Sequence, residues 1–443
     1  MRVAVFVVVL GFGCGDNLRL PVGIHNGSTL VARSYVAGDA SLFRSWHDTQ
    51  TDVDCAFQVA ADGRYRCLPM QSYAGYADPN CTKPNVTVMP CTDTPRFVIG
   101  PRRALAACPT DDGVGVYAVG AATPDQAYYY SDGTGCRLGT NGSGGELHAL
   151  TEVPLAGFVA ADLVHDGAGS IQSYAFHAED GALQADSTWD TTRDAECSIY
   201  DDELRCRPTE IALHYDDLWT DDACTIHAAV DLSRVRPCAR PNAVREYEPS
   251  TGEVVHSEIG AAIPVAYTGS AGACSVASAL AGDVYYLEGA RIPESQFPAE
   301  TQVLDGTGRV RALRYEQTTG SPLASAHALY DTTFDEVCDP QPFVDGSTRC
   351  VPRSAPQGGG IYADSACSRP IAQVNPATHP RVFLAAHGDD TCGGVVRYES
   401  FAVGAPYTGA LYANPHCQAY PRDPSMTYLT VGDAIELEEL DEH

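Results

Sequence analysis

The chain has little positive charge and almost no lysine. Only 28 Lys and Arg residues stand against 57 Asp and Glu residues, the net charge is -29 at pH 7, and Lys83 is the single lysine. A strongly acidic chain repels phosphate backbones, so nucleic-acid binding is excluded and a basic or cation-bridged partner is expected. Hydrophobic residues make up 44% of the chain, which is enough for folded cores and excludes global disorder.

Long stretches with helical periodicity are also lacking. Gly (41) and Pro (29) interrupt the chain every few residues, and the segments between them are short and rich in Val, Tyr, Thr and Phe. Turn signals such as Asp166-Gly167 and Asp180-Gly181 separate these segments. Many short strands with regular turns predict an all-β protein.

Motifs that carry known chemistry are missing as well. The stretch Asn141–Gly145 is the nearest approach to a nucleophile elbow and does not match it. There is no His-Glu-x-x-His, P-loop or EF-hand pattern, so no catalytic residue is assigned. No Cys-x-x-Cys pair is present, which argues against cysteine-ligated structural zinc and leaves any other metal site undefined.

The N-terminus has the features of a secretion signal. Arg2 precedes the apolar run Val3–Phe12, which is too short to span a bilayer, since that needs ~20 residues. Small residues then lead to Cys14, and this pattern resembles a bacterial lipoprotein signal. The resemblance implies removal of residues 1–13, a lipid on Cys14 and a short tether over 14–27. The chain departs from the family pattern because Leu10 lies four residues before the cysteine instead of three. Plain secretion is the alternative.

Three copies of one pattern follow the tether. Each copy has an aromatic residue followed by two Asp residues and a cysteine, then an Arg-Cys pair, then a further cysteine after an Asp. Cys55, Cys197 and Cys338 lie 142 and 141 residues apart, and this near-constant period predicts repeat units at 28–165, 166–304 and 305–443.

Each repeat unit divides again into two halves of roughly 70 residues. About four strands per half-unit would make six small sheets, an arrangement that resembles a six-bladed β-propeller. The alternative is a row of three tandem β-sandwich domains. The fold prediction is therefore an all-β chain with a threefold internal repeat of about 142 residues, arranged as a propeller or as tandem sandwiches.

The cysteines predict a disulfide framework. Sixteen remain besides Cys14, an even number that is typical of complete pairing in an oxidising compartment. The most local pairing predicts seven bridges: Cys55–Cys67, Cys197–Cys206, Cys338–Cys350, Cys81–Cys91, Cys224–Cys238, Cys108–Cys136 and Cys392–Cys417. Cys274 and Cys367 have no local partner and either pair with each other or are free.

Several repeated side chains have two interpretations. Six acids recur at Asp-x-x-x-Asp spacing, and they either hold calcium or close turns: Asp48, Asp52, Asp190, Asp194, Asp331 and Asp335. The aromatic position packs in a core or stacks on sugar rings: Trp46, Trp189 and Tyr330. The arginines before cysteines are expected to pair with neighbouring acids: Arg66, Arg205 and Arg349. The unrepeated histidines are expected to be surface or hydrogen-bonded residues: His47, His148, His177 and His387.

Repetition without catalytic motifs favours a binding role over an enzymatic one. The sequence predicts an extracytoplasmic lipoprotein of the bacterial envelope, in the outer membrane or at the cell surface. The membrane is contacted through the lipid alone, and the partner is a protein or a polysaccharide. No cofactor is assigned apart from the calcium hypothesis. The alternative is a glycan-active hydrolase with one unrepeated acidic site, because catalytic sites rarely occur three times in one chain.

Overall fold

The computed structural model is built almost entirely from β-strands, joined in two places by single turns of 3-10 helix, η1 (Leu155–Gly157) and η2 (Glu294–Gln296). The described residues are 20–72, 75–89, 93–104, 112–123, 127–131, 135–139, 145–199, 204–209, 211–231, 241–248, 253–270, 273–277, 284–317, 327–358, 360–389, 395–413 and 416–443. The all-β prediction is confirmed.

Three antiparallel meanders form the centre of the molecule. The first contains β2 (Leu30–Ala37), β3 (Ala40–Asp48), β4 (Val53–Val59) and β5 (Tyr65–Pro69). The second contains β13 (Ala160–Asp166), β14 (Ile171–Ala178), β15 (Leu183–Asp190), β16 (Ala195–Ile199) and β17 (Cys206–Pro208), with the short β1 (Ile24–His25) on β15. The third contains β25 (Glu300–Asp305), β26 (Val310–Gln317), β27 (Ala328–Asp331), β28 (Glu336–Pro342) and β29 (Thr348–Pro352).

The meanders are joined edge to edge into a closed ring. β13 pairs with β5, and β25 meets β17 through a bridge between Arg205 and Ala299. The C-terminal strand β37 (Glu439–Glu442) pairs with both β2 and β29. The last strand of the chain therefore lies between β2 and β29, and neither of these two strands is left as an open edge.

Side chains from neighbouring meanders fill the ring. Ala40 of β3, Leu329 of β27 and Leu440 of β37 are buried in one cluster. Trp46 is completely buried in a second cluster with the disulfide between Cys55 and Cys67, and its indole N–H donates to Gln184 of β15. Burial of such side chains across the seams favours one fixed arrangement of the three meanders.

A lobe of seven strands follows each meander. Lobe 1 contains β6 (Gly75–Tyr76), β7 (Pro84–Val88), β8 (Phe97–Ala104), β9 (Asp112–Ala122), β10 (Tyr129–Ser131), β11 (Cys136–Leu138) and β12 (Glu146–Val153). Lobe 2 contains β18 (Ile211–Trp219), β19 (His227–Asp231), β20 (Ala243–Glu248), β21 (Glu253–Ile263), β22 (Tyr267–Ser270), β23 (Ala273–Val276) and β24 (Val284–Arg291). Lobe 3 contains β30 (Ile361–Tyr362), β31 (Ile371–Val374), β32 (Val382–Asp389), β33 (Val395–Pro406), β34 (Leu411–Ala413), β35 (Gln418–Tyr420) and β36 (Thr427–Ala434).

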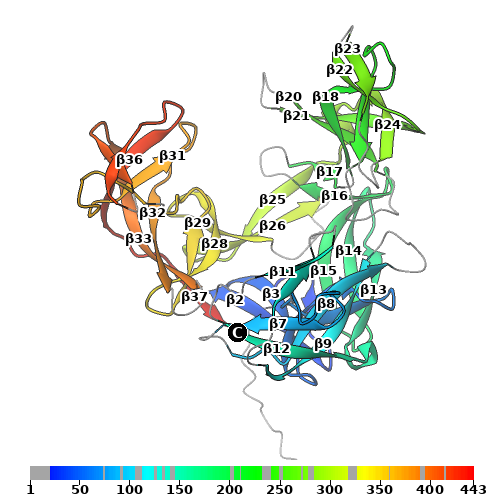
Figure 1. Ribbon diagram of the computed structural model, residues 1–443, viewed down its shortest axis with the longest axis horizontal. Coiled ribbons are helices and arrows are strands. Elements are labelled where there is room, and N and C mark those ends of the chain that lie inside the picture. The colour runs from blue at the N-terminus through cyan, green and yellow to red at the C-terminus, as the bar shows by residue number, and fades with distance from the viewer. Residues whose placement is uncertain are drawn as a thin grey trace, which may run out of the picture.

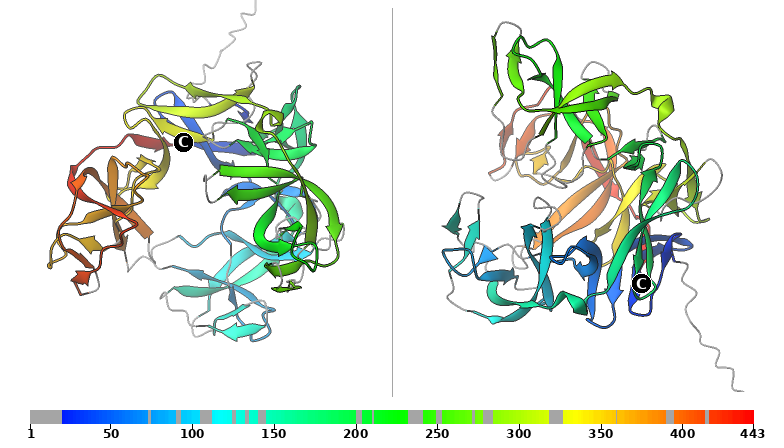
Figure 2. Two further views of the ribbon diagram at one scale, coloured as in Figure 1. Left: turned by 90° about the horizontal axis from the view of Figure 1, so that it is seen from above. Right: turned by 90° about the vertical axis from the view of Figure 1, so that its right-hand side faces the viewer.

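The lobes project away from the ring and from one another. Figure 1 shows lobe 2 at the top and lobe 3 at the left, and Figure 2 shows the three lobes set apart around the centre. In lobe 2 the pairing runs β18-β19-β24-β21-β20 and returns to β18, so five strands close into a small barrel. The hairpin of β22 and β23 extends from the end of β18.

The strand order differs from the propeller prediction. The described strands form sheets of sixteen, seven, seven, four and three strands, whereas a six-bladed propeller has six separate sheets of about four. Short strands between turns occur in both architectures, and their spacing does not encode which strands pair. β37 pairs with β2, although the two strands lie at opposite ends of the chain. No pattern of neighbouring residues in the sequence predicts this pairing.

Candidate functional site

The described disulfides confirm some of the cysteine pairings predicted from local spacing and contradict others. Three bridges across paired ring strands are confirmed: Cys55–Cys67, Cys197–Cys206 and Cys338–Cys350. The other three described bridges are Cys81–Cys136, Cys224–Cys274 and Cys367–Cys417. Each of these spans 50 to 55 residues within one lobe.

Four predicted pairings are therefore wrong: Cys81–Cys91, Cys108–Cys136, Cys224–Cys238 and Cys392–Cys417. The prediction that Cys274 and Cys367 pair together or stay free is also wrong, because each is bonded within its own lobe. Strand pairing is the reason, since β6 lies beside β10 and carries the loop of Cys81 onto the hairpin of Cys136. Cys14, Cys91, Cys108, Cys238 and Cys392 lie outside the described residues.

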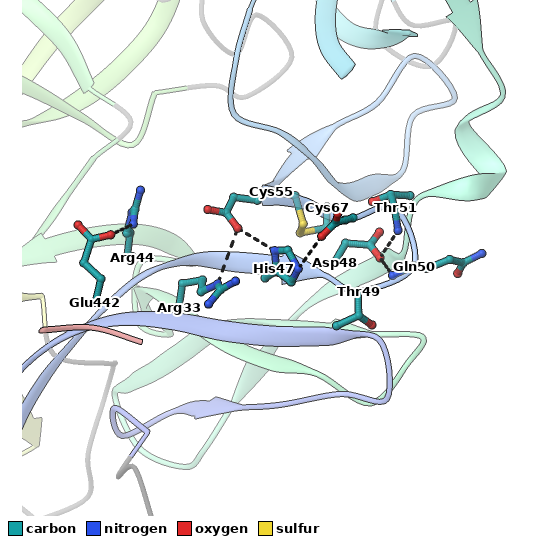
Figure 3. A network of polar contacts seen from close by, with 12 residues as sticks. Arg33, Arg44, His47, Asp48, Thr49, Gln50, Thr51, Cys55, Cys67 and Glu442 are labelled. Carbon is teal, nitrogen blue, oxygen red and sulfur yellow. Dashed lines mark hydrogen bonds and ion pairs between the residues drawn. A yellow bond between two sulfur atoms is a disulfide. The ribbon is translucent and has the colours of Figure 1, made fainter. Parts of the chain in front are cut away.

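The first acid of each Asp pair closes a turn. Asp48, Asp190 and Asp331 are at most 1% exposed. Their Oδ1 atoms accept backbone N–H groups two residues on, each at 2.8 Å. Figure 3 shows this arrangement for Asp48, Gln50 and Thr51.

The second acid of each pair lies in the left-handed region. Asp52, Asp194 and Asp335 have φ of 57°, 52° and 58°. Such a conformation suits the short polar side chain of Asp in a tight turn. These contacts support the turn interpretation of the repeated acids, and none of the six belongs to the group of three potential metal ligands that the described residues contain.

A second set of acids, which recur before cysteines in the sequence but had no role assigned, organises the disulfide loops of the lobes. The carboxylates of Asp78, Asp221 and Asp364 each accept backbone N–H groups four and five residues on. The cysteine enclosed by each loop, at positions 81, 224 and 367, has φ between 51° and 53°. In lobe 2 the hydroxyl and amide of Thr225 bond Asp221 and lower the pKa of its carboxyl.

The arginines before cysteines link the ring to the turns that lead into the next meander. Arg66 donates to the carbonyl of Phe158 at 2.7 Å, and Arg205 donates to the carbonyl of Phe297 at 2.6 Å. Arg349 donates in the same way to the carbonyl of Leu437 at 3.2 Å. The predicted acid partners are present for Arg66 and Arg349, which pair with residues 62 and 345 at 2.8 Å.

The repeated aromatic position has three different environments. Trp46 is completely buried in a hydrophobic cluster of the ring. Trp189 is half-buried and stacks on His165 with 4.3 Å between ring centroids. Tyr330 donates its hydroxyl to Asp335, and this bond raises the pKa of Tyr330 to about 12.

The four singled-out histidines each have a hydrogen-bond partner, as predicted. His47 contacts Asp54 at 3.0 Å, and Figure 3 shows His47 in this network. The remaining three bond a carbonyl or a carboxylate, namely His148 with Gly120, His177 with Asp166 and His387 with Glu399.

The mouth of the lobe 2 barrel gathers a different set of polar side chains. His214 and Asp216 come from β18, Glu246 from β20 and Glu288 from β24. His214 Nδ1 lies 2.7 Å from Glu288 Oε2. His214 Nε2 lies 3.5 Å from Asp216 Oδ1 and 3.9 Å from Glu246 Oε1. In the described part of the chain, His214, Asp216 and Glu246 form the one group of three whose ligand atoms lie within 4.8 Å of one another.

Burial and hydrogen bonding act in opposite directions on the pKa values of His214 and Glu288 at this mouth. The side chains of His214 and Glu288 are 7% and 14% exposed, whereas Asp216 is 86% exposed and faces solvent. The hydrogen bond to Glu288 raises the pKa of His214 above its usual value, and burial opposes this effect. Burial tends to raise the pKa of Glu288, but its bonds to His214 and Ser257 lower it. Both pKa shifts are therefore in the directions that favour opposite charges on the pair.

A second imidazole lies beside the first. The ring of His227 on β19 is 4.8 Å from the ring of His214 and stacks on Trp219 at 4.1 Å. Below these rings the barrel is apolar, with Ala212, Val244 and other small or aromatic side chains buried in one cluster.

Sequence reasoning missed this cluster because it looked for residues that recur. The corresponding stretches of lobes 1 and 3, at 70–76 and 355–362, contain no histidine and no acid. One signal was present, since His214 and Asp216 are two residues apart in a strand and so face the same side. The contributions of Glu246 and Glu288 depend on strand pairing and had no such signal.

Six disulfides among the described residues indicate an oxidising, extracytoplasmic environment. Within the described part of the chain, no helix is long and apolar enough to cross a membrane.

Comparison with known proteins gives one match. The model of a family of unknown function (DUF7481) matches residues 6–297 and matches again over 254–441. No curated protein matches the chain, and no solved structure does.

Proposed function

Because the chain belongs to this family of unknown function, we propose a function from its own residues: it is a non-enzymatic binding protein of the bacterial envelope. Its partner is a protein or a polysaccharide of the cell surface. Cys14 carries the lipid that holds the chain at the membrane, and the lobes present the binding surface.

The chain is built from three copies of one unit, each consisting of a ring meander and a lobe. Equivalent disulfides, equivalent Asp turns and equivalent arginine contacts at a period of about 142 residues support this inference. The two overlapping matches of one family model support it as well. Closure of the ring by β37 gives the lobes a common rigid base, and a rigid base is typical of a binding scaffold.

The observation that carries the binding role is the exposed apolar surface of lobe 2. Seven of the fifteen exposed large apolar side chains in the described part of the chain lie on this lobe. Tyr215 and Tyr247 are 43% and 64% exposed, and they lie two residues beyond Leu213 and Arg245, the last pair in the parallel register of β18 and β20. Exposed aromatic side chains that lie together mark interaction surfaces, because their burial by a partner is favourable.

A hydrolase acting on glycans is a second candidate, and one observation favours it. The acids at the mouth of lobe 2 occur once in the chain, as a single active site would require. Against it, the pKa of Glu288 is lowered by its bond to His214, whereas a general acid in such an enzyme needs a raised pKa. Release of reducing ends from envelope polysaccharides by the purified chain would favour this second candidate.

A capture experiment tests the binding role. The chain from Gly15 to His443, with disulfides intact, is immobilised and exposed to envelope extract from the producing bacterium. We expect a reproducible partner that the double variant Tyr215→Ser with Tyr247→Ser no longer retains. The matched control changes exposed tyrosines of the other lobes, Tyr130→Ser with Tyr420→Ser, and should retain the partner. Equal retention by both double variants would contradict a binding surface on lobe 2.

The lipid anchor needs its own measurement. Fatty-acid labelling of the full chain in cells should be lost in Cys14→Ala. Labelling that persists in this variant would contradict lipidation at Cys14 and favour plain secretion.

A further inference from the structure

We propose that the mouth of the lobe 2 barrel is a binding site for a first-row divalent transition cation such as Zn²⁺, with His214, Asp216 and Glu246 as its ligands. The site is separate from the exposed tyrosines of the same lobe and does not depend on the proposed partner.

The spacing of the three ligand atoms fits such a cation. Bonds of about 2.1 Å at tetrahedral angles place ligand atoms about 3.4 Å apart. The separations of His214 Nε2 from Asp216 Oδ1 and Glu246 Oε1 are 3.5 Å and 3.9 Å, and no pair of ligand atoms exceeds 4.8 Å. A small inward movement of Glu246 completes the geometry, because its side chain is flexible.

Glu288 prepares the histidine for this role. Its carboxylate accepts the hydrogen of His214 Nδ1 at 2.7 Å, so in the neutral ring the lone pair is on Nε2, which faces Asp216 and Glu246. A carboxylate that orients a metal-binding histidine through its other nitrogen is a recurrent feature of metal sites. Glu288 itself is held by Ser257 of β21, so the orienting group is fixed by a third strand.

The arrangement requires a positive charge at its centre. Nε2 of a neutral His214 and the two ionised carboxylates are all acceptors, so without a cation they would face one another unfavourably. A positive charge satisfies these three acceptors. It can be either a proton on His214 or a metal ion. Metal and proton therefore compete for the same nitrogen.

The donor set selects among metals. One imidazole and two carboxylates suit zinc and its neighbours in the first transition row, whereas calcium takes six to eight oxygen ligands. Three protein ligands leave at least one coordination position for water or for a group of a partner. The apolar layer beneath, which includes Ala212 and Val244, confines the ion to the mouth.

Titration calorimetry of Zn²⁺ into the chelator-treated, disulfide-intact chain tests the proposal. We expect one tight site per chain. We expect His214→Gln, Asp216→Asn and Glu246→Gln each to weaken binding by at least tenfold, and Glu288→Gln to weaken it about 10- to 100-fold.

A matched control separates this site from weak binding to a highly acidic surface. His387 on lobe 3 lies 3.0 Å from Glu399, but through Nε2, whereas His214 bonds Glu288 through Nδ1. Among the described residues, His387 belongs to no group of three potential metal ligands. The variant His387→Gln should bind Zn²⁺ as the wild type does, and excess Ca²⁺ should not displace the ion.

Three results would overturn the proposal. These are equal affinity in His214→Gln and wild type, equal losses in His387→Gln and His214→Gln, or displacement by Ca²⁺. Asp216 is exposed, so Asp216→Asn keeps the test valid if the buried His214→Gln variant fails to fold. Unchanged Zn²⁺ binding in the double tyrosine variant, together with loss of the partner, would show that the two sites are independent.

Discussion

Glu300, at the start of ring strand β25, makes the stability of the protein depend on pH in a defined direction. Its side chain is 5% exposed, and neither carboxylate oxygen has a hydrogen-bond partner among the described residues. Burial alone raises the pKa of Glu300 to about 8 from an ordinary value of 4.5. The charged form is thus the unfavourable one in the folded chain.

The sign and size of the effect follow from linkage. Because the folded pKa is the higher one, stability is full below the ordinary value of 4.5 and is lost as the pH rises from there through about 8. A difference of one pKa unit corresponds to about 1.4 kcal/mol, so the loss at pH 7 is about 3 kcal/mol. Between pH of about 5 and about 8.5 it amounts to about 4 kcal/mol.

The substitution Glu300→Gln removes the charge and keeps the shape. Denaturant unfolding of the full, disulfide-intact chain, followed by tryptophan fluorescence, should show wild-type stability falling toward high pH and the variant falling much less. Above pH of about 8 the variant should be the more stable protein. The control Glu179→Gln changes an exposed carboxylate beside the ring and should keep the wild-type slope. Equal slopes for wild type and Glu300→Gln would refute the reasoning.

Three further predictions concern the lobes and the turns. Replacing Cys224 and Cys274 with Ser should lower the free energy of unfolding of lobe 2 by about 4 kcal/mol, the loop-entropy value for a closed loop of 50 residues, as measured by calorimetry of the full chain. Asp221→Ala should lower the melting temperature of lobe 2 at neutral pH. It should also reduce the acid sensitivity of lobe 2, because the pKa of Asp221 is lowered in the folded state and its contribution is lost as pH falls below about 4. Adding Ca²⁺ to the chelator-treated chain should leave the melting temperature unchanged if Asp48 and its equivalents only close turns, and a rise would support the calcium interpretation.

The sequence predicted local structure well, because local structure depends on neighbouring residues. The Asp48 turn and the Cys55–Cys67 bridge both connect strands that follow one another, and both were recognisable from spacing. Pairing between distant strands is decided by tertiary packing. The Cys81–Cys136 bridge and the joining of β37 to β2 depend on it, so neither was predictable from a single sequence.

The group of His214, Asp216 and Glu246 shows the same limit of prediction from a single sequence. His214 and Asp216 share a strand face, so half of the cluster was visible in principle. Glu246 lies on the strand that runs parallel to β18, and Glu288 comes from a strand 74 residues further along the chain than His214. Closure of the barrel brings these residues together. A search for recurring residues does not find them, because the other two lobes lack them.

Residues that recur in the sequence and residues that occur once therefore have different roles in this chain. The residues that recur in the sequence stabilise turns and strand pairs, since Asp48, Asp190 and Asp331 bond corresponding backbone groups and the cysteines form corresponding bridges. Chemistry can then differ between lobes without disturbing the ring. In lobe 2 the alternation of side chains along β18 and β20 places His214 and Glu246 on the inner side of the barrel and Tyr215 and Tyr247 on the outer side. The proposed cation and the proposed partner therefore contact opposite sides of the same two strands, and the two sites need share no side chain.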